Sequence, residues 1–196
     1  SYYTYASIDL PIKDLIEKEF NLPTLIENDA TSACFGEQWL DGENNFKNII
    51  YMFSGVCCGI MLNGEIYTGS NGYAGEVSIY NYKESDTFNC DAANGCFLKR
   101  SEVDLGIIED VKEALSKEEK AADNFLKVAS CDLNNIELKN IFIANRAKDK
   151  TAGWALDRAA KRLGIKISFL VNLLNPELVI IGGGLEEAGD DFLNKV

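Results

Sequence analysis

The fold of this chain is decided by residues 49–79, which read IIYMFSGVCCGIMLNGEIYTGSNGYAGEVSI. Ile49 to Phe53 is a run of β-branched, aromatic and other apolar residues, and it predicts a strand that stops at Ser54-Gly55. A second predicted strand, Gly59 to Leu62, is followed by Asn63-Gly64, a pair that tolerates the positive φ angles of a type I′ turn. The stretch therefore predicts a glycine-turned β-hairpin.

The hairpin leads into a loop of small residues, which reads GSNGYAGE from Gly69 to Glu76. Glu76 is the only acidic side chain in this loop, and its neighbours are too small to block a ligand. Loops of this kind often form the floor of a polar small-molecule pocket. We therefore take the part from Asn71 and Gly72 to Glu76 as a candidate ligand contact.

Composition excludes several function classes. The 196 residues carry a net charge of −12, with no basic cluster, which argues against nucleic acid as a partner of this segment. The absence of histidine excludes a histidine general base or metal ligand within it. No apolar run reaches the length of a membrane span, so we expect no membrane contact and a cytoplasmic protein. In that compartment the six cysteines are expected to be reduced thiols.

Helices and strands are predicted to alternate around the hairpin. Extra strands are expected at Leu22–Ile26 and Glu177–Ile181, and Ser116 to Glu119 matches a capping box. The first expected helix runs from after Pro11 to Asn21, and the second covers Ala30–Leu40. A third begins beyond Glu102, and a fourth runs from Ser116 to about Ala129. The last two cover Leu138–Ala147 and Thr151–Leu174. Asn28 or Asp29 is placed to cap the second of these. This order predicts an α/β fold with a mixed sheet flanked by helices.

Three separated segments resemble the ROK family of sugar kinases and sugar-responsive repressors. Pro23 to Glu37 resembles the family's strand, Asn-Asp-Ala and helix segment, and Ser54 to Glu76 its glycine-rich hairpin and Ala-Gly-Glu loop. Ile167 to Gly189 resembles its long helix, Asn-Pro turn and Gly-Gly strand end. The order and spacing of the three segments also agree with the family.

The resemblance implies an actin-like (ribonuclease H-like) ATPase fold of two α/β lobes with a sugar in the cleft. Residues 1–43 would be the remainder of the N-terminal lobe, and residues 44–196 the C-terminal lobe without the family's last helices. We expect a partial chain, because nothing before Tyr5 matches the family's Asp-x-Gly-Gly-Thr phosphate motif. In the family's repressors a winged helix-turn-helix precedes these lobes, so DNA would be contacted only through a domain outside this segment.

The resemblance also implies which residues contact the sugar. Asn28 and Asp29 occupy the positions that hold sugar hydroxyls, and Asp29 would be the general base if the protein is a kinase. Glu76 would be a further sugar ligand, beside Asn71 and Gly72. The alternative interpretation of Asn28 and Asp29 is a plain helix cap, and that of Glu76 is a solvated loop carboxylate.

Departures from the family pattern concern metal and phosphate. Ser78 and Ile79 replace a Gly-His pair, and the segment Asn89–Leu98 keeps only Gly95 and Cys96 in register with a zinc motif. We therefore expect no metal site, and zinc in particular is not expected. The phosphate loop keeps Gly55 and Gly59 beside Ser54, whereas Phe53 and Cys57 stand where the family has glycine. The adenine-side turn is retained as Gly182-Gly183-Gly184.

These observations predict the sugar-binding effector domain of a ROK-type transcriptional regulator, which would form a homodimer and need no cofactor. One alternative is an ATP-dependent sugar kinase that phosphorylates a hexose and uses Mg-ATP. A second alternative is a degenerate domain that serves only dimerisation. The first two differ in phosphate binding, because phosphoryl transfer depends on positioned phosphate contacts and sugar sensing does not.

Overall fold

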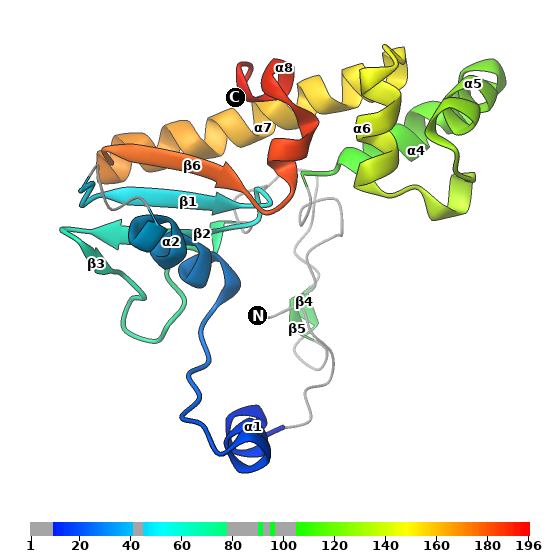
Figure 1. The fold of residues 1–196 in the computed structure, drawn as a ribbon. Coiled ribbons are helices and arrows are strands. Elements are labelled where there is room, and N and C mark those ends of the chain that lie inside the picture. The colour runs from blue at the N-terminus through cyan, green and yellow to red at the C-terminus, as the bar shows by residue number, and fades with distance from the viewer. Residues whose placement is uncertain (1–9, 41–44, 78–89, 92–94, 97–104) are drawn as a thin grey trace.

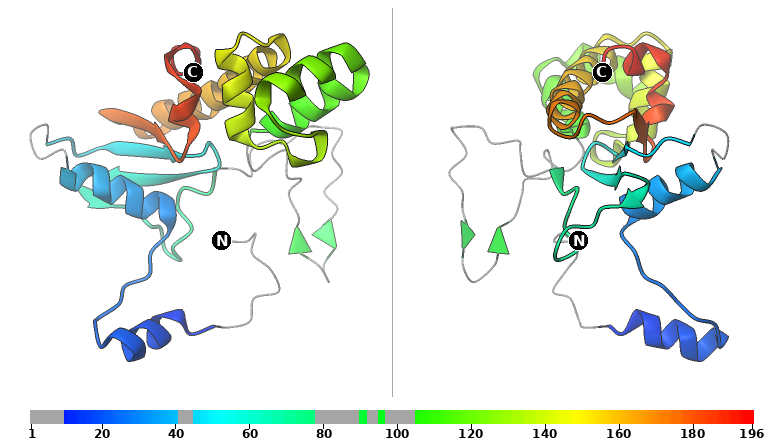
Figure 2. Two further views of the ribbon diagram at one scale, coloured as in Figure 1. Left: turned by 45° about the vertical axis from the view of Figure 1, so that its right-hand side comes forward. Right: turned by 90° about the vertical axis from the view of Figure 1, so that its left-hand side faces the viewer.

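A central sheet lies between one helix on its first face and a long helix on its second (Figures 1 and 2). The computed structural model describes residues 10–40, 45–77, 90–91, 95–96 and 105–196. The strands of the main sheet are β1 (Ile49–Phe53), β2 (Cys57–Leu62), β3 (Glu65–Ile66) and β6 (Leu178–Gly182). The helices that cover it are α2 (Asp29–Leu40) and α7 (Lys150–Leu174).

The predicted hairpin organises this sheet. Its strand order is β3-β2-β1-β6, with β1 antiparallel to β2 and parallel to β6. The sheet is therefore mixed, as predicted from the order of elements. Asn63 and Gly64 adopt φ angles of 55° and 84°, which confirms the tight turn between β2 and β3.

The helices that follow residue 104 gather around the N-terminal half of α7. They are α4 (Ile107–Lys117), α5 (Glu119–Ala129), η2 (Leu133–Asn135), α6 (Leu138–Arg146), η3 (Leu185–Ala188) and α8 (Asp190–Leu193). Small residues such as Ala155 and Ala159 are fully buried on α7, so the neighbouring helices approach its backbone closely. One core thus joins these helices to the sheet face that carries Ile50 and Met52.

Helix α1 (Ile12–Phe20) forms where predicted and ends at Asn21, which has the left-handed φ of 51°. None of its residues is buried, and Figure 1 shows it apart from the sheet. The strand predicted at Leu22–Ile26 is wrong. Leu25 is 94% exposed, and Thr24 N–H donates to the Glu17 side chain rather than to a strand. A β-strand is defined by its hydrogen bonds to a neighbouring strand, and no described strand adjoins this segment.

Three local predictions also need correction. Ser116 does not open a capping box, because it lies inside α4 and its hydroxyl donates to Glu113 O at 2.7 Å. On α7, the predicted apolar face is buried at Leu163 and Leu170, but Val171 is 38% exposed. β6 is half-buried rather than buried, because it lies at the edge of the described sheet.

Among the described residues, no helix combines the length and apolarity that crossing a membrane requires.

Glu177 fastens the start of β6 to the start of β1. Its Oε2 accepts hydrogen bonds from the backbone N–H groups of Lys47 at 2.7 Å and Asn48 at 2.8 Å. These bonds favour the charged form and hold the pKa of Glu177 below its usual value. The carboxylate therefore ties together the two parallel strands at one end.

We predict that Glu177→Gln is less stable than the wild type at neutral pH. A depressed folded-state pKa contributes stability above the unfolded value, and this contribution disappears as the pH falls through the folded-state pKa. Urea unfolding at pH 7 and at pH values below 4 should therefore show a gap that closes in acid. A gap of constant size would contradict this account of Glu177.

Asp110 links α4 to α7 through two arginines. Arg162 Nη1 donates to Asp110 Oδ2 at 2.7 Å and to the carbonyl of Leu105 at 2.5 Å, and Arg158 Nε reaches the same carboxylate at 3.1 Å. Asp110 is only 8% exposed, whereas Arg158 also stacks on Trp154. Loss of this carboxylate would leave Arg162 half-buried without its anion.

We predict that Asp110→Ala lowers the free energy of unfolding by roughly 3 kcal/mol, the order seen when one partner of a buried ion pair is removed. Lys117→Ala is the control, because it removes a pair with Glu113 in which both side chains are about two-thirds exposed. That variant should change stability by less than about 0.5 kcal/mol. Equal effects of the two variants in chemical denaturation would show that the Asp110 cluster is not structural.

Candidate functional site

The N-terminus of α2 rests directly on β2 at Gly59. A Cβ at position 59 would lie 2.2 Å from the carbonyl oxygen of Ala30 and 2.5 Å from Cys34 Cβ. Only glycine leaves room for this contact. The packing places Asn28 and Asp29, which begin α2, beside the end of β2 that carries Cys57.

The Ala-Gly-Glu loop rests on the adjacent residue of β2. Cys58 N–H donates to the carbonyl of Gly75 at 2.8 Å, and a Cβ on Gly75 would lie 1.9 Å from Cys58 O. Gly75 also has a φ of 91°, which side chains rarely adopt. Glycine is therefore required at position 75 for two reasons. The contact of Gly75 with β2 fixes the position of the next residue, Glu76.

One of the predicted sugar ligands, Asp29, lies beside Cys57. The thiol of Cys57 is 3.9 Å from Asp29 Oδ1, and Glu76 follows Gly75, whose carbonyl accepts from the N–H of the next residue, Cys58. Burial first, and then the charges of Asp29 and Glu76, raise the pKa of Cys57 to about 12. The thiol therefore stays protonated at neutral pH beside Asp29, which is exposed.

Asn28 is a helix cap in this structure. Its Oδ1 accepts from the backbone N–H groups of Ala30 at 3.0 Å and Thr31 at 3.2 Å. Asp29 Oδ1 accepts from Ala30 N–H at 2.8 Å, while Asp29 itself is exposed at the first turn of α2. The capping interpretation is thus confirmed for Asn28. This cap uses only the side-chain oxygen of Asn28. Asn71 and Gly72 are exposed at the tip of their loop.

The two glycine-bearing turns lie together at the carboxyl ends of β1 and β6. Ser54 N–H donates to Gly182 O at 3.0 Å, and Ser54 Oγ donates to Gly183 O at 2.5 Å. Gly183 N–H is bonded to the phenol oxygen of Tyr51, and Gly184 N–H donates to Glu186 Oε2 at 2.8 Å. Four donors that a phosphate or nucleotide could use are therefore engaged within the protein.

Close packing also explains why these turns contain glycine. A Cβ on Gly182 would lie 2.0 Å from the Tyr51 hydroxyl, and one on Gly183 would lie 2.5 Å from Ser54 Oγ. At Gly55 the nearest atoms would belong to Leu105. Each glycine thus has a structural role, and nucleotide contact at these positions stays a prediction.

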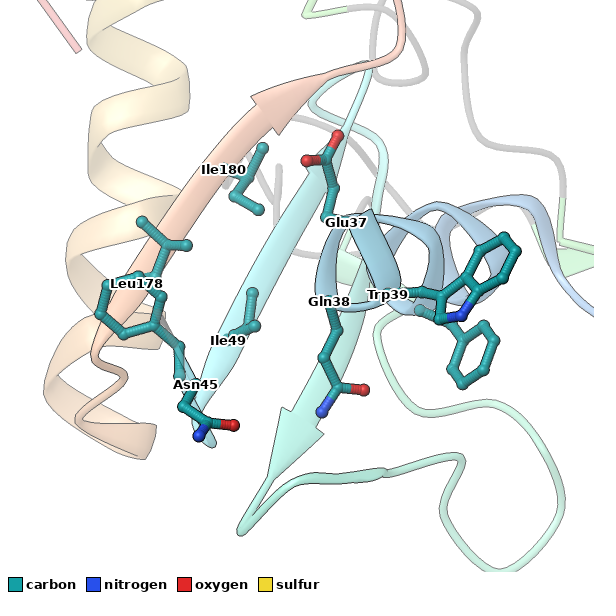
Figure 3. Close-up of a pocket in the computed structure, with 9 residues that line it drawn as sticks. Glu37, Gln38, Trp39, Asn45, Ile49, Leu178 and Ile180 are labelled. Carbon is teal, nitrogen blue, oxygen red and sulfur yellow. The ribbon is translucent and has the colours of Figure 1, made fainter. Parts of the chain in front are cut away.

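Among the hollows formed by the described residues are a pocket and a groove that the sequence did not predict. One, of about 420 Å³, lies beside the C-terminal half of α2 (Figure 3). It is lined by Phe35, Glu37, Gln38, Trp39, Asn45, Phe46, Ile49, Leu178 and Ile180. The other, a groove of about 700 Å³, lies between α7 and the loop of residues 67–77, and Glu76 contributes to its wall. Neither includes Asn28 or Asp29.

Four cysteines are free thiols: Cys34, Cys57, Cys58 and Cys131. Burial raises the pKa of Cys34 to about 11. Burial, followed by the neighbouring Cys57, raises the pKa of Cys58 to about 12. No group of three or more histidine, cysteine or acidic side chains gathers as a metal would require, within the described ranges.

The positions of the altered zinc motif are described only in part. The backbones of Cys90 and Cys96 face each other where β4 (Cys90–Asp91) pairs with β5 (Gly95–Cys96). Ser78, Ile79, Asn89 and Leu98 lie outside the described residues. The expectation of no zinc therefore stays a prediction.

The sheet, its two covering helices and the paired glycine turns define an α/β protein of the actin-like ATPase fold. Among solved structures, a glucokinase from Streptomyces griseus in complex with glucose and AMPPNP matches with a TM-score of 0.79 at 23% identity, over 94% of this chain and 60% of the other. A ROK-family transcriptional regulator, a homologue of the E. coli MLC protein, matches with a TM-score of 0.72 at 22% identity, over 94% and 45%.

The chain belongs to the ROK family, whose model matches residues 5–196. A glucokinase from Halalkalibacterium halodurans is 34% identical over 192 residues, which are 96% of this chain and 57% of that protein. The xylose repressor of Caldicellulosiruptor bescii is 27% identical over 96% of this chain and 46% of its own length. The chain thus spans about half the length of these relatives, which include both kinases and repressors.

We predict that Gly59→Ala destabilises the protein by about 2 kcal/mol or more, because the new methyl group overlaps backbone that cannot move freely. Gly36→Ala in α2, the helix that packs against Gly59, is the control, since nothing lies within 4 Å of a Cβ there. That change should be neutral or stabilising by up to about 1 kcal/mol. Thermal or urea unfolding compares them, and a harmless Gly59→Ala would disprove the proposed helix–strand contact.

Proposed function

We propose that this chain is the sugar-binding effector region of a ROK-type transcriptional regulator. The observation that carries the proposal is the contrast between the acidic side chains and the backbone donors near this end of the sheet. Asp29 is exposed to solvent beside Cys57, and Glu76 is half-buried in the loop that packs against Cys58. The turns at Ser54 and at Gly183-Gly184 have their hydrogen-bond donors occupied by protein groups.

Sugar hydroxyls suit the acceptor side. A carboxylate accepts hydrogen bonds from hydroxyl groups, and bonds to a charged acceptor are stronger than neutral ones. Asp29 keeps Oδ2 for a ligand, because Ala30 N–H and the Cys57 thiol both lie at Oδ1. Asn28, Asn71, Gly72 and Glu76 complete the proposed contacts. The xylose repressors among the relatives support a small sugar as the effector.

The phosphate side fits ATP poorly. Cradling a phosphate relies on backbone N–H groups that are free to bind it. Ser54, Gly183 and Gly184 use theirs inside the fold, and Gly55 O accepts from the buried Lys166 at 2.9 Å. DNA contact and dimerisation belong to the proposal only through parts of a longer protein and a second copy.

A sugar kinase is the second candidate, and one observation favours it. The relative from Halalkalibacterium halodurans, at 34% identity, is a glucokinase. Asp29 could then be the general base, since an exposed carboxylate at a helix N-terminus can accept the proton of an attacking hydroxyl. A domain used only for dimerisation is the third interpretation, and it requires that no sugar bind.

We predict that glucose or xylose raises the melting temperature of the protein, because a ligand that binds only the folded state stabilises it. Asp29→Asn should weaken that sugar at least about tenfold in calorimetry, since a hydrogen bond to a charged group is worth about 1.5–3 kcal/mol. Asp123→Asn on α5 is the matched control and should leave the affinity unchanged.

ADP release by the full-length protein in the presence of Mg-ATP separates the candidates. The regulator proposal expects none with any sugar that binds. Sugar-dependent ADP release that is lost in Asp29→Asn would establish the kinase instead. Failure of every sugar in a panel of hexoses, pentoses and N-acetylhexosamines to shift the melting temperature would leave the dimerisation scaffold.

A further inference from the structure

The pocket beside the C-terminal half of α2 has an apolar floor that the helix leaves open. α2 packs on β1 and β2, whereas β6 lies at the edge of the sheet beyond β1. Because β6 pairs in register with β1, Leu178 lies beside Ile49, and both form the floor together with Ile180 (Figure 3). Ile49 is buried, whereas Leu178 and Ile180 are only half-buried. The floor therefore offers apolar surface to a ligand.

Two half-buried polar side chains of α2, Glu37 and Gln38, also line the pocket. Figure 3 shows Glu37 on the side of the helix that faces β1 and β6, with Trp39 on the opposite side. Within the described ranges, no hydrogen bond or ion pair engages the side chain of Glu37 or Gln38. Asn45, in the segment before β1, adds a third polar side chain to the wall. These groups are therefore available to a ligand.

The volume and the charge of the pocket indicate which kind of ligand fits. A volume of about 420 Å³ lies within the range that holds small molecules, roughly 300–1,000 Å³. Of the described residues that line it, Glu37 alone carries a charge. A half-buried carboxylate is screened less by salt than one on an open surface, so it attracts a cation and repels an anion more strongly.

We propose that this pocket binds a small organic cation, an ammonium or guanidinium group on an apolar body. The cationic group pairs with Glu37, and the apolar body lies on Leu178 and Ile180. Gln38 and Asn45 provide hydrogen bonds to a further polar group of the ligand. None of the proposed sugar contacts lines the pocket, so this inference does not depend on the proposed function.

The test compares a cation with a neutral molecule of nearly the same shape. Phenethylamine is the probe, and 2-phenylethanol is its neutral counterpart. In NMR titrations of the ¹⁵N-labelled protein, phenethylamine should shift the amide signals of residues 37–39 and 178–180. The alcohol should bind at least about tenfold more weakly, because a hydrogen bond to a charged group is stronger than one between neutral groups. Equal affinities for the two compounds would overturn the inference without any variant.

Glu37→Gln removes the charge and keeps the shape of the side chain. It should weaken phenethylamine about tenfold and leave the binding of the alcohol unchanged. Since the carboxylate has no hydrogen bond or ion pair within the described part of the chain, the melting temperature should stay the same. Glu65→Gln is the control, because Glu65 is exposed on β3 and does not line the pocket. It should change neither affinity by more than about twofold.

Three results would contradict the proposed site. The first is the absence of any signal shift with millimolar phenethylamine. The second is an unchanged affinity for phenethylamine in Glu37→Gln. The third is a shift of the same amide signals with protein concentration alone, which would show that a second copy of the chain covers the pocket instead of a small cation.

Discussion

The structure depends on one constraint: α2, which precedes the hairpin in the sequence, and the Ala-Gly-Glu loop, which follows it, must both touch adjacent residues of β2. Gly59 lets the backbone of α2 approach to within contact of the strand, and Gly75 lets the loop do the same at Cys58. A methyl group at either position would collide with a carbonyl oxygen, which cannot move without shifting its whole element. Because α2 carries Asp29 and the loop carries Glu76, these two glycines hold the elements that bear both acidic residues against the start of β2.

The two glycine-bearing turns at the same end of the sheet have a different role. There the turns after β1 and β6 are bonded to each other through Ser54 and to Tyr51 through Gly183. These bonds satisfy buried backbone groups and lock two parallel strands at their carboxyl ends, as Glu177 locks them at their start. The glycines that look like a nucleotide loop in sequence are thus explained by packing against Tyr51, Ser54 and Leu105. Positive φ angles and close contacts leave the same sequence signature whether the neighbour is a ligand or the protein itself.

Local patterns predicted what local forces decide. The strand Ile49–Phe53, the Asn63-Gly64 turn and the long helix were all predicted from the sequence, because each depends on neighbours in the chain. Leu22–Ile26 failed for the opposite reason, since an extended segment needs a partner strand. The capping box at Ser116 failed because Ser116 continues α4 instead of ending it. Asn28 and Asp29 were singled out, but nothing in the sequence showed that the Cys57 thiol would lie beside Asp29. A glycine inside a predicted strand, Gly59, was the one available signal that a backbone approaches there.

For a sugar sensor, the useful property of this arrangement is that the two carboxylates belong to different elements mounted on one strand. A ligand that contacts both Asp29 and Glu76 favours the state in which α2 and the loop rest on β2 together. A state in which either element has moved away loses one contact, and that difference in affinity is the free energy available for regulation. Glu76 also lines the groove along α7, where Phe169 and Leu173 are more than half exposed. The same loop would therefore contribute to the proposed sugar contact and to an apolar surface, and movement of this one loop would be enough to couple the two.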